Sequence, residues 1–339
     1  MPLRTGLLGY GVAGRVFHAP LLAATPGVEL AAIVTADPGR RARAAAEHPG
    51  ATLLDTSDEL FALDLDLVVV ASPNRTHVPL ALAAVEAGVP VVVDKPFAPT
   101  SADARRVVRA ADYRGVPLTV FQNRRWDSDF LAVRSLVADG SLGEVARFES
   151  RFERWAPEVG DNWRELGAPE EAGGLLYDLG AHLVDQALEL FGPVATAYCE
   201  LDARRAGAVV DDDVFVALTH VNGVRSHLWA SSAAPHHGPR FRVLGSAAAY
   251  VSHGLDRQEE ALAAGKPFDD LSTIGRLGVL EGAEDVVAPP GAYGEFYRLL
   301  VVALTEGGPL PVEPGSAVRA LEVIEAAFDS ARTGRVVSL

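Results

Sequence analysis

The start of this 339-residue chain constrains its fold more than any other segment. A short, largely apolar run over residues 3–8 leads directly into Gly9-Tyr10-Gly11-Val12-Ala13-Gly14, which has the spacing G-x-G-x-x-G. In a strand–turn–helix unit the first glycine permits the tight turn, the second lets the backbone approach a pyrophosphate, and the third lets the helix pack against the strand. The N–H groups at the start of such a helix attract the anion. A β–α turn without a ligand is the alternative, and the following segments decide between the two.

Strand-like and helix-like segments alternate over the first third of the chain. The strand-like runs consist of Val, Ile and Leu without polar alternation, which predicts strands buried on both faces of a parallel sheet. The predicted strands are residues 28–35, 67–71, 90–93 and 117–121, and the predicted helices are 38–47, 78–87 and 100–114. We therefore predict an α/β fold that begins with a Rossmann domain, a doubly wound parallel sheet, over residues 1–122.

After residue 122 apolar and polar residues alternate, which is typical of antiparallel strands with one buried face. These segments are 144–155, 194–201, 213–220, 225–232 and 241–244, and helices are expected over 127–137, 294–305 and 316–332. Residues 123–339 are thus predicted to form an α+β domain with a mainly antiparallel sheet. Helices would cover one face of that sheet, so we expect a homodimer or homotetramer to cover the other.

Composition narrows the possible partners. The net charge of −15 without a long Lys/Arg cluster argues against nucleic acid and against anionic membranes. No apolar run approaches the ~20 residues of a membrane helix, and no signal peptide is recognisable, so we expect a cytoplasmic protein. The single cysteine, Cys199, cannot form an intramolecular disulfide and no metal-ligand spacing occurs, so we expect a core cysteine and no metal.

Five motifs agree with one family. They are the glycine-rich turn with Phe17-His18-Ala19-Pro20, Ser72-Pro73-Asn74 with Thr76-His77, Asp94-Lys95-Pro96, Asn123-Arg124-Arg125-Trp126-Asp127, and Tyr177-Asp178-Leu179-Gly180-Ala181-His182. Together they resemble the Gfo/Idh/MocA oxidoreductases over essentially the whole chain, and the branch with NADP-dependent scyllo-inositol dehydrogenases most. The resemblance implies reversible hydride transfer between a nicotinamide cofactor and a hydroxyl or carbonyl carbon of a sugar, a cyclitol such as inositol, or a related small polyol. It also implies that the sheet of residues 123–339 is open and that this domain binds the substrate.

Three residues are catalytic candidates. Lys95 directly follows a predicted buried strand, at the edge of the sheet where open α/β folds bind ligands, and a lysine there can stabilise alkoxide character on the reacting oxygen. Asp178 and His182 are four residues apart in the helix-like segment 175–191, so both can project from one face. Histidine accepts protons near neutral pH. A helix-terminal acid and a core histidine are the alternative, and the resemblance favours the catalytic role. Either Lys95 or His182 could accept the proton.

The resemblance also implies cofactor-binding residues beyond the glycine-rich turn. They are Thr35, Arg40, Ser72, Pro73, Asn74, His77, Asp94, Lys95, Asn123, Trp163 and Arg164. Thr35 is expected at the tip of the second strand, where NAD enzymes of the family carry an aspartate, and Arg40 and Arg41 follow within reach of a 2′-phosphate. This pattern favours NADP. NAD remains possible if Asp37 occupies the tip.

Two other functions share this fold. The first is a dinucleotide-binding regulator without catalysis, and the second is an NAD-assisted glycosidase that holds its cofactor tightly. Retention of Lys95, Asp178 and His182 together favours the dehydrogenase. Outside these motifs, Asp211-Asp212-Asp213 is predicted to be a solvated hairpin turn rather than a metal cluster, and His236-His237 a surface loop.

Overall fold

The structure is a computed structural model that describes residues 1–160, 165, 171–268 and 270–339. The chain divides into two units, each with its own sheet. Unit 1 comprises Met1–Asn123, Gln258–Asp269 and Ala292–Val318, and unit 2 comprises Arg124–Arg257, Asp270–Gly291 and Arg319–Leu339. The division into domains 1–122 and 123–339 stays a prediction.

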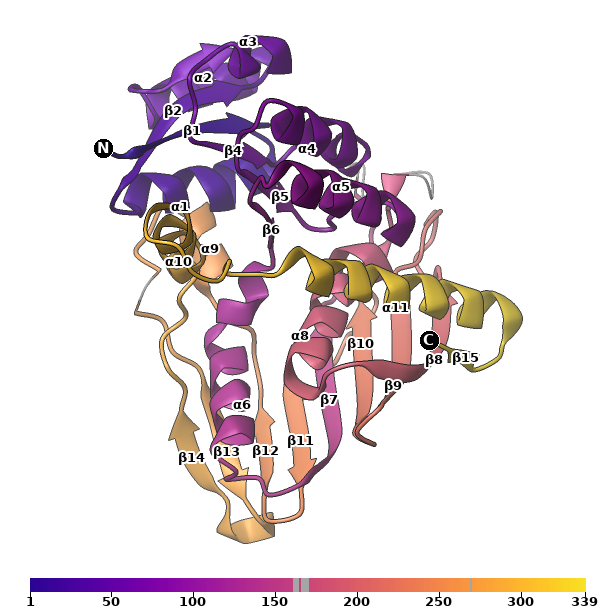
Figure 1. The fold of residues 1–339 in the computed structure, drawn as a ribbon. Helices are drawn as coiled ribbons and strands as arrows, with labels where there is room; N and C mark the ends of the chain where they lie inside the picture. Colours follow the sequence, from indigo (N-terminus) through magenta and orange to yellow (C-terminus); the bar gives the residue numbers. More distant parts are fainter. Residues whose placement is uncertain (161–164, 166–170, 269) are drawn as a thin grey trace. The chain divides into compact units, whose positions relative to one another are not determined.

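A six-stranded parallel sheet is the centre of unit 1 (Figure 1). In spatial order its strands are β3 (Thr52–Leu54), β2 (Val28–Val34), β1 (Leu3–Leu8), β4 (Leu67–Val70), β5 (Val91–Asp94) and β6 (Leu118–Phe121). Every residue of β4, β5 and β6 is buried, as expected for β-branched and apolar runs covered on both faces. The strand order reverses direction between β1 and β4, and open α/β folds bind ligands at the carboxyl ends of strands beside such a point.

Helices from distant parts of the chain pack in unit 1. They are α1 (Ala19–Ala24), α2 (Pro38–Glu47), α3 (Ser57–Phe61), α4 (His77–Glu86), α5 (Ser101–Arg114), α9 (Gln258–Ala263) and α10 (Gly294–Thr305). A π-helical turn, η1 (Ala13–His18), precedes α1, and a short 3-10 turn, η2 (Asn74–Thr76), precedes α4. From α10, Phe296 and Tyr297 pack their rings against Phe121 of β6 at centroid distances of 4.9 and 5.9 Å. Unit 1 therefore completes its core with residues far along the chain.

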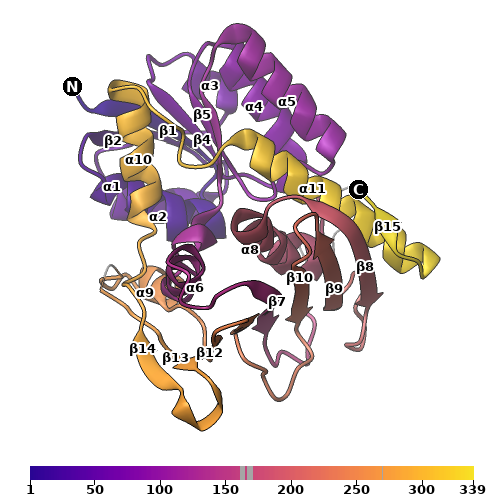
Figure 2. The same cartoon turned by 60° about the horizontal axis from the view of Figure 1, so that its bottom comes forward.

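A nine-stranded mixed sheet forms the centre of unit 2 (Figures 1 and 2). Its order is β14 (Glu284–Val287), β13 (Ile274–Gly278), β12 (Ala249–Ser252), β11 (Phe241–Gly245), β7 (Val145–Glu153), β10 (Arg225–Ser231), β9 (Asp213–His220), β8 (Val194–Asp202) and β15 (Val337–Ser338). Neighbouring strands are antiparallel except β7 and β10, which are parallel.

Helices cover one face of this sheet. They are α6 (Ser128–Ala138), α8 (Ala181–Phe191), which continues from the π-helical turn η5 (Leu176–Gly180), and most of α11 (Pro314–Thr333), which begins in unit 1. In β9 every second residue is buried and the residues between are partly exposed, so the other face of the sheet meets solvent in this chain. Phe215 and Trp229 lie on that face with ring centroids 5.1 Å apart, and the guanidinium of Arg151 lies 3.8 Å from the Trp229 ring.

The predicted fold class is confirmed, and each predicted strand and helix is present with ends within two residues. Three differences have physical causes. The strands β3 and β12–β15 and the helices α3 and α9 are short and were not predicted. The parallel β7–β10 pair could not be read from alternation, which reports a half-buried face and not the direction of the neighbour. The segment 175–191 opens as a π-helical turn rather than as α-helix.

Two smaller predictions are also borne out. Cys199 is a free, buried cysteine, and burial raises the pKa of its thiol to about 12, so it is a core residue. His236 and His237 are exposed in the loop before β11. In the part of the chain that the structure describes, no helix combines the length and apolar character needed to cross a bilayer.

Candidate cofactor and catalytic site

The glycine-rich turn has the local geometry that a bound dinucleotide requires. Gly9 has a φ of +105°, and a Cβ there would lie 2.6 Å from the carbonyl oxygen of Ala71. At Gly14 a Cβ would lie 2.1 Å from the carbonyl oxygen of Gly9, so only glycine lets the helix start so close to the strand. A Cβ at Gly11 would meet no described atom within 4 Å, which leaves its backbone open to an approaching ligand. The turn therefore fits a pyrophosphate group.

The side chains around this turn fix it to the end of α2. The hydroxyl of Tyr10 donates to Oε2 of Glu47 at 2.5 Å, and Nη2 of Arg15 lies 2.8 Å from Oε1 of the same carboxylate. The Tyr10 side chain is buried, whereas Val12 at the tip of the turn is exposed. The side chain of Tyr10 thus packs in the core, and only its backbone can contact a ligand.

The end of β2 leads from Thr35 to Asp37 and Arg40 at the start of α2. Thr35 follows the strand and is buried. Asp37 caps α2, since its Oδ1 accepts from the backbone N–H of Arg40 at 2.7 Å. Arg41 pairs with Asp55 at 2.6 Å, whereas the side chain of Arg40 is exposed and makes no ion pair with the described residues.

His77 connects the loops that follow β4 and β5. Its Nδ1 lies 2.9 Å from the carbonyl oxygen of Pro96, and its Nε2 lies 2.9 Å from that of Ser72. Burial lowers the pKa of His77 although the carboxylate of Asp94 opposes this shift. Within the same loop Asn74 is buried. A neutral imidazole can donate to only one of these two carbonyl oxygens, and its ring lies between two loops whose residues are predicted to contact the cofactor.

Asp94 and Lys95 lie at the carboxyl end of β5. Oδ1 of Asp94 accepts from the backbone N–H of Lys95 at 2.9 Å, and the Lys95–Pro96 peptide is cis. Burial would raise the pKa of Asp94, but the facing nitrogen of His18 and the neighbouring His77 and Lys95 keep that pKa below its usual value. Asn123 is buried shortly after β6, so all described cofactor candidates belong to unit 1.

His18 is a polar residue of this site that the sequence motifs did not assign to a role. It occurs in one of the motifs that carried the resemblance, at the last position of η1, and is completely buried. Its spacing of four residues after Gly14 was the available signal, because that spacing returns a helical side chain to the face that carries the glycine.

Asp178 and His182 belong to unit 2. Asp178 lies in η5 and is half-buried, and His182 lies in the first turn of α8, is buried, and has its ring centroid 6.4 Å from that of Phe152. The predicted four-residue spacing on one helical segment is present. The roles of Asp178, His182 and Lys95 stay predictions, and Trp163 and Arg164 lie outside the described residues.

A distant acid anchors the start of the segment that carries Asp178. Oδ2 of Asp211 accepts from the backbone N–H of Leu176 at 2.7 Å, and its carbonyl oxygen accepts from that of Leu175 at 2.9 Å. Gly174 has a φ of +93°, and a Cβ there would lie 2.1 Å from Oδ1 of Asp211. Burial raises the pKa of the Asp211 carboxyl, and the backbone hydrogen bonds counteract this shift.

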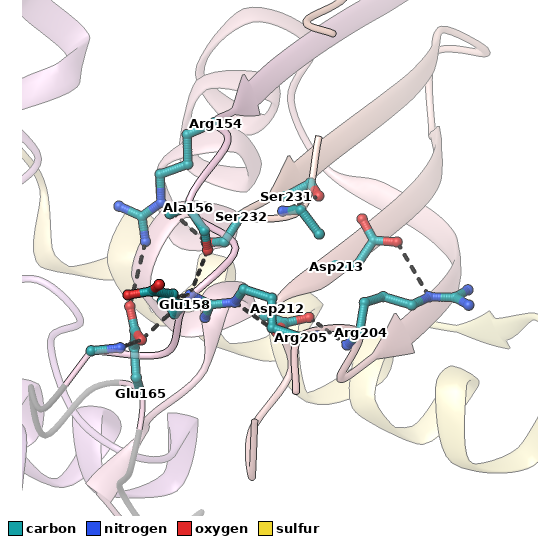
Figure 3. A network of polar contacts seen from close by, with 12 residues as sticks. Arg154, Ala156, Glu158, Glu165, Arg204, Arg205, Asp212, Asp213, Ser231 and Ser232 are labelled. Atoms are coloured by element: carbon teal, nitrogen blue, oxygen red, sulfur yellow. Dashed lines mark hydrogen bonds and ion pairs between the residues drawn. The ribbon is translucent and has the colours of Figure 1, made fainter. Parts of the chain in front are cut away.

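Residues 211–213 lie where the connection between the antiparallel strands β8 and β9 enters β9, as predicted, but the prediction that they are solvated is wrong for Asp212. Asp212 is buried and its Oδ2 lies 2.8 Å from Nε of Arg205 (Figure 3). Arg205 in turn donates to the carbonyl oxygens of Ala156 and Glu158 at 3.2 and 3.1 Å. The three acids have separate partners, because Asp211 accepts from the distant backbone of Leu176, Asp212 pairs with Arg205, and Asp213 lies 3.7 Å from Nε of Arg204. Among the described residues no group of three or more possible ligands is arranged to hold a metal ion.

A Rossmann sheet with a glycine-rich turn at its reversal point, followed by a mixed-sheet unit, defines the class of two-part dinucleotide-binding proteins. Residues 3–122 match the family model described as "Oxidoreductase family, NAD-binding Rossmann fold". Residues 130–251 match the model described as "GFO/IDH/MocA C-terminal domain". The chain belongs to the Gfo/Idh/MocA family of oxidoreductases.

Relatives of known name cover nearly the whole chain. The oxidoreductase YdgJ of Escherichia coli is 43% identical over 97% of this chain and 96% of its own length. The scyllo-inositol 2-dehydrogenase (NADP(+)) IolW of Bacillus subtilis is 33% identical over 99% of this chain and 96% of its own. The solved structure of an NAD-binding protein from Listeria innocua superposes with a TM-score of 0.86 at 27% identity, covering 100% of this chain and 97% of that one. These similarities agree with an oxidoreductase that binds a nicotinamide dinucleotide.

Proposed function

We propose that the protein is an NADP-dependent dehydrogenase that interconverts a secondary hydroxyl and a ketone on a cyclitol or sugar ring. The observation that carries this proposal is the placement of Lys95 directly after β5, in the unit whose glycine-rich turn fits a dinucleotide. The backbone N–H of Lys95 donates to the carboxylate of Asp94. The similarity to a scyllo-inositol dehydrogenase supports the substrate class. The cytoplasmic location stays a prediction.

The preference for NADP is supported by the end of β2. A free aspartate there would repel a 2′-phosphate and bind the ribose hydroxyls of NAD. Thr35, not an aspartate, directly follows β2, one oxygen of the Asp37 carboxylate caps α2, and the exposed guanidinium of Arg40 is available to a phosphate. The relative IolW carries NADP(+) in its name, which agrees with this assignment.

The chemistry divides among three side chains. When bound, the nicotinamide accepts a hydride from the carbinol carbon. Lys95 would hydrogen-bond the substrate oxygen and stabilise its developing negative charge. His182 would take the hydroxyl proton as the C=O bond forms, and Asp178 would bind a neighbouring hydroxyl of the ring. The reverse reaction returns the proton from His182 to the carbonyl oxygen.

The proposal is tested by following absorbance at 340 nm with NAD and NADP against inositols, aldoses and their oxidised forms. Turnover with NADP that is lost in Lys95→Ala would support it. Cofactor binding without turnover on any polyol would instead indicate a regulator. A dinucleotide that stays bound through purification and accompanies glycoside cleavage would indicate a glycosidase.

We further propose that the helix-free face of the unit 2 sheet is covered by a second copy of the chain. Phe215, Trp229 and Arg151 stack on this face, and such apolar and cationic surfaces are common in interfaces. Sedimentation should show a dimer or tetramer at micromolar concentration, and Trp229→Glu should shift it towards the monomer. A monomeric wild-type protein would contradict the assignment.

A further inference from the structure

Three buried polar side chains of unit 1 form a line that ends at Asp94. The hydroxyl of Tyr297, from α10, lies 2.6 Å from Nδ1 of His18. On the other side of the ring, Nε2 of His18 lies 3.7 Å from Oδ1 of Asp94. Tyr297 and His18 are completely buried and Asp94 is 9% exposed. Three distant segments of the sequence thus place a tyrosine, a histidine and an aspartate in a row.

The protonation of this row follows from its contacts. Burial raises the pKa of Tyr297 well above its ordinary value, so its hydroxyl keeps its proton and can donate it to Nδ1 of His18. A neutral imidazole carries one N–H, which is then on Nε2. That N–H faces the carboxylate of Asp94 and has no hydrogen-bond acceptor closer among the described residues.

The surroundings hold the imidazole in place and keep water away. The ring of Phe121 lies 4.4 Å from that of His18 between centroids. An apolar residue would fill such a site without the penalty of burying two ring nitrogens. The polarity of His18 therefore needs an explanation beyond packing.

Asp94 has one oxygen committed and one available. Oδ1 accepts from the backbone N–H of Lys95 and faces His18, whereas Oδ2 makes no hydrogen bond to the described residues. The charged or titratable groups that face Asp94 are His18 from η1, His77 from α4, Tyr297 from α10 and its neighbour Lys95. Asp94 is the acid next to the proposed catalytic lysine, at the edge of the sheet where the dinucleotide is expected.

We propose that His18 is a positioning residue: oriented by Tyr297, it holds the Asp94 carboxylate so that its second oxygen can accept hydrogen bonds from a ribose diol of the bound dinucleotide. This inference rests on the proposed function, because it requires that the protein bind a nicotinamide dinucleotide. It assigns a binding task to two residues, His18 and Tyr297, that would not touch the cofactor.

The test is a fluorescence titration of the full-length protein with NADPH, which requires no substrate. His18→Leu removes both contacts and should raise Kd about tenfold, in the range expected for weakening a charged hydrogen bond. His18→Gln can still accept from Tyr297 and donate towards Asp94, so its Kd should stay within about threefold of wild type. Tyr297→Phe keeps the imidazole but removes the hydrogen bond that fixes which ring nitrogen carries the proton. The Kd of this variant should lie between those of His18→Gln and His18→Leu.

Coupling and pH give readouts that packing alone would not move. His18→Leu should have little further effect in an Asp94→Asn background, because the effect acts through the carboxylate. Since His18 helps to keep the pKa of Asp94 low, NADPH affinity should begin to fall at a higher pH in His18→Leu than in wild type as the solution is acidified. The matched control is Thr119→Val, which removes another buried hydrogen bond of unit 1, from Thr119 to the carbonyl oxygen of Val312. It should lower the melting temperature and leave Kd unchanged.

Two results would overturn the inference. The first is an unchanged Kd and pH dependence in His18→Gln and Tyr297→Phe together with a wild-type-like Kd in His18→Leu. The second is an equal loss of affinity with and without Asp94→Asn, which would mean that His18 only packs the unit. If His18→Leu does not fold, Tyr297→Phe decides, because a wild-type Kd and pH dependence in that variant would overturn the inference. A wild-type protein that binds neither NADPH nor NADH would overturn the proposed function, and the inference with it.

Discussion

Two helical segments carry the candidate chemistry, and they are held in place in different ways. Both begin with a π-helical turn, η1 in unit 1 and η5 in unit 2, a feature frequent at functional sites. The start of η1 is fixed by neighbours in sequence, since Gly14 closes against Gly9. The start of η5 is fixed by Asp211, which is 35 residues beyond Leu176. A motif thus describes the start of the first segment completely and the start of the second only in part.

The largest expected effect tests whether Lys95 in unit 1 and His182 in the second segment are catalytic. Lys95→Ala and His182→Ala should each lower kcat about 10²- to 10⁴-fold, as expected for loss of a general acid or base, and leave NADPH affinity nearly unchanged. His182→Ala should also flatten the pH profile of kcat near neutrality. Asp178→Ala should act mainly on KM. Steady-state kinetics over a range of pH checks all three.

The control for this comparison is His220→Gln, which alters another buried histidine of unit 2. His220 bonds the carbonyl oxygen of Gly192 and the hydroxyl of Ser226, so its replacement should reduce stability and not kcat. If His182→Ala turns over like wild type with the same pH profile, histidine is not the base and Lys95 takes that role.

Substitutions at the two anchoring glycines should have different effects on cofactor binding and on turnover. Gly14→Ala should abolish detectable NADPH binding, because its Cβ would lie 2.1 Å from a backbone oxygen. Gly174→Ala should leave NADPH binding intact and lower kcat about tenfold or more, because it displaces Asp211 and strains a residue with φ of +93°. Calorimetry with NADPH and steady-state rates measure both. Equal loss of NADPH affinity in the two variants would remove the distinction between local and distant anchoring.

A smaller effect is expected for cofactor choice. Thr35→Asp should favour NADH by repelling the 2′-phosphate, and the double variant Arg40→Ala with Arg41→Ala should weaken NADPH about tenfold and leave NADH unaffected. Because Arg41 is already paired with Asp55, Arg40→Ala alone should account for most of the change. Titrations with both dinucleotides decide, and unchanged Kd values for both would refute the assignment.

The smallest effect concerns two buried acids with opposite behaviour. The pKa of Asp94 in unit 1 is held low, whereas in unit 2 burial, with the carboxylates of Asp129 and Asp256 nearby, raises the pKa of Asp127 to about 8. When folding raises the pKa of a carboxyl, the protein loses stability as pH rises from the unfolded pKa of ~4 towards 8. Stability should therefore fall over this range by one to a few kcal/mol, because each tenfold change in proton affinity corresponds to about 1.4 kcal/mol.

Urea unfolding between pH 5 and 8 measures this slope. The variant Asp127→Asn carries no titrating proton and should show a flatter dependence than wild type. Asp139→Asn, at an exposed acid after α6, is the control, and its slope should equal that of wild type. A wild-type stability that rises steadily up to pH 8 would contradict the assignment to Asp127.

The sequence was sufficient for what is determined locally. Continuous Val runs predicted β4 and β5, and the spacing of Gly9, Gly11 and Gly14 predicted a turn whose geometry fits a dinucleotide. It was insufficient where a partner lies far away in the chain. Asp211 resembles a solvated acid until its hydrogen bond with the backbone of Leu176, 35 residues earlier, is known, and His18 resembles an ordinary helix residue until Tyr297 packs beside it.

The same limit explains the strands that were missed. β12, β13 and β14 are each four or five residues long, and such runs form strands only because neighbours supply hydrogen bonds. The parallel pairing of β7 with β10 likewise depends on which strands become neighbours in the sheet. The local pattern contains neither kind of information.

The interruption of unit 1 along the chain has a consequence for biosynthesis. Phe121 and His18 are buried partly by Phe296 and Tyr297, which the ribosome adds more than a hundred residues later. Until then the nascent amino-terminal segment has no cover for these rings, and exposed apolar surface of this kind invites aggregation or chaperone binding. An expression fragment cut after residue 122 would carry that exposed patch permanently, whereas a fragment that appends the α10 region by a linker would restore its cover.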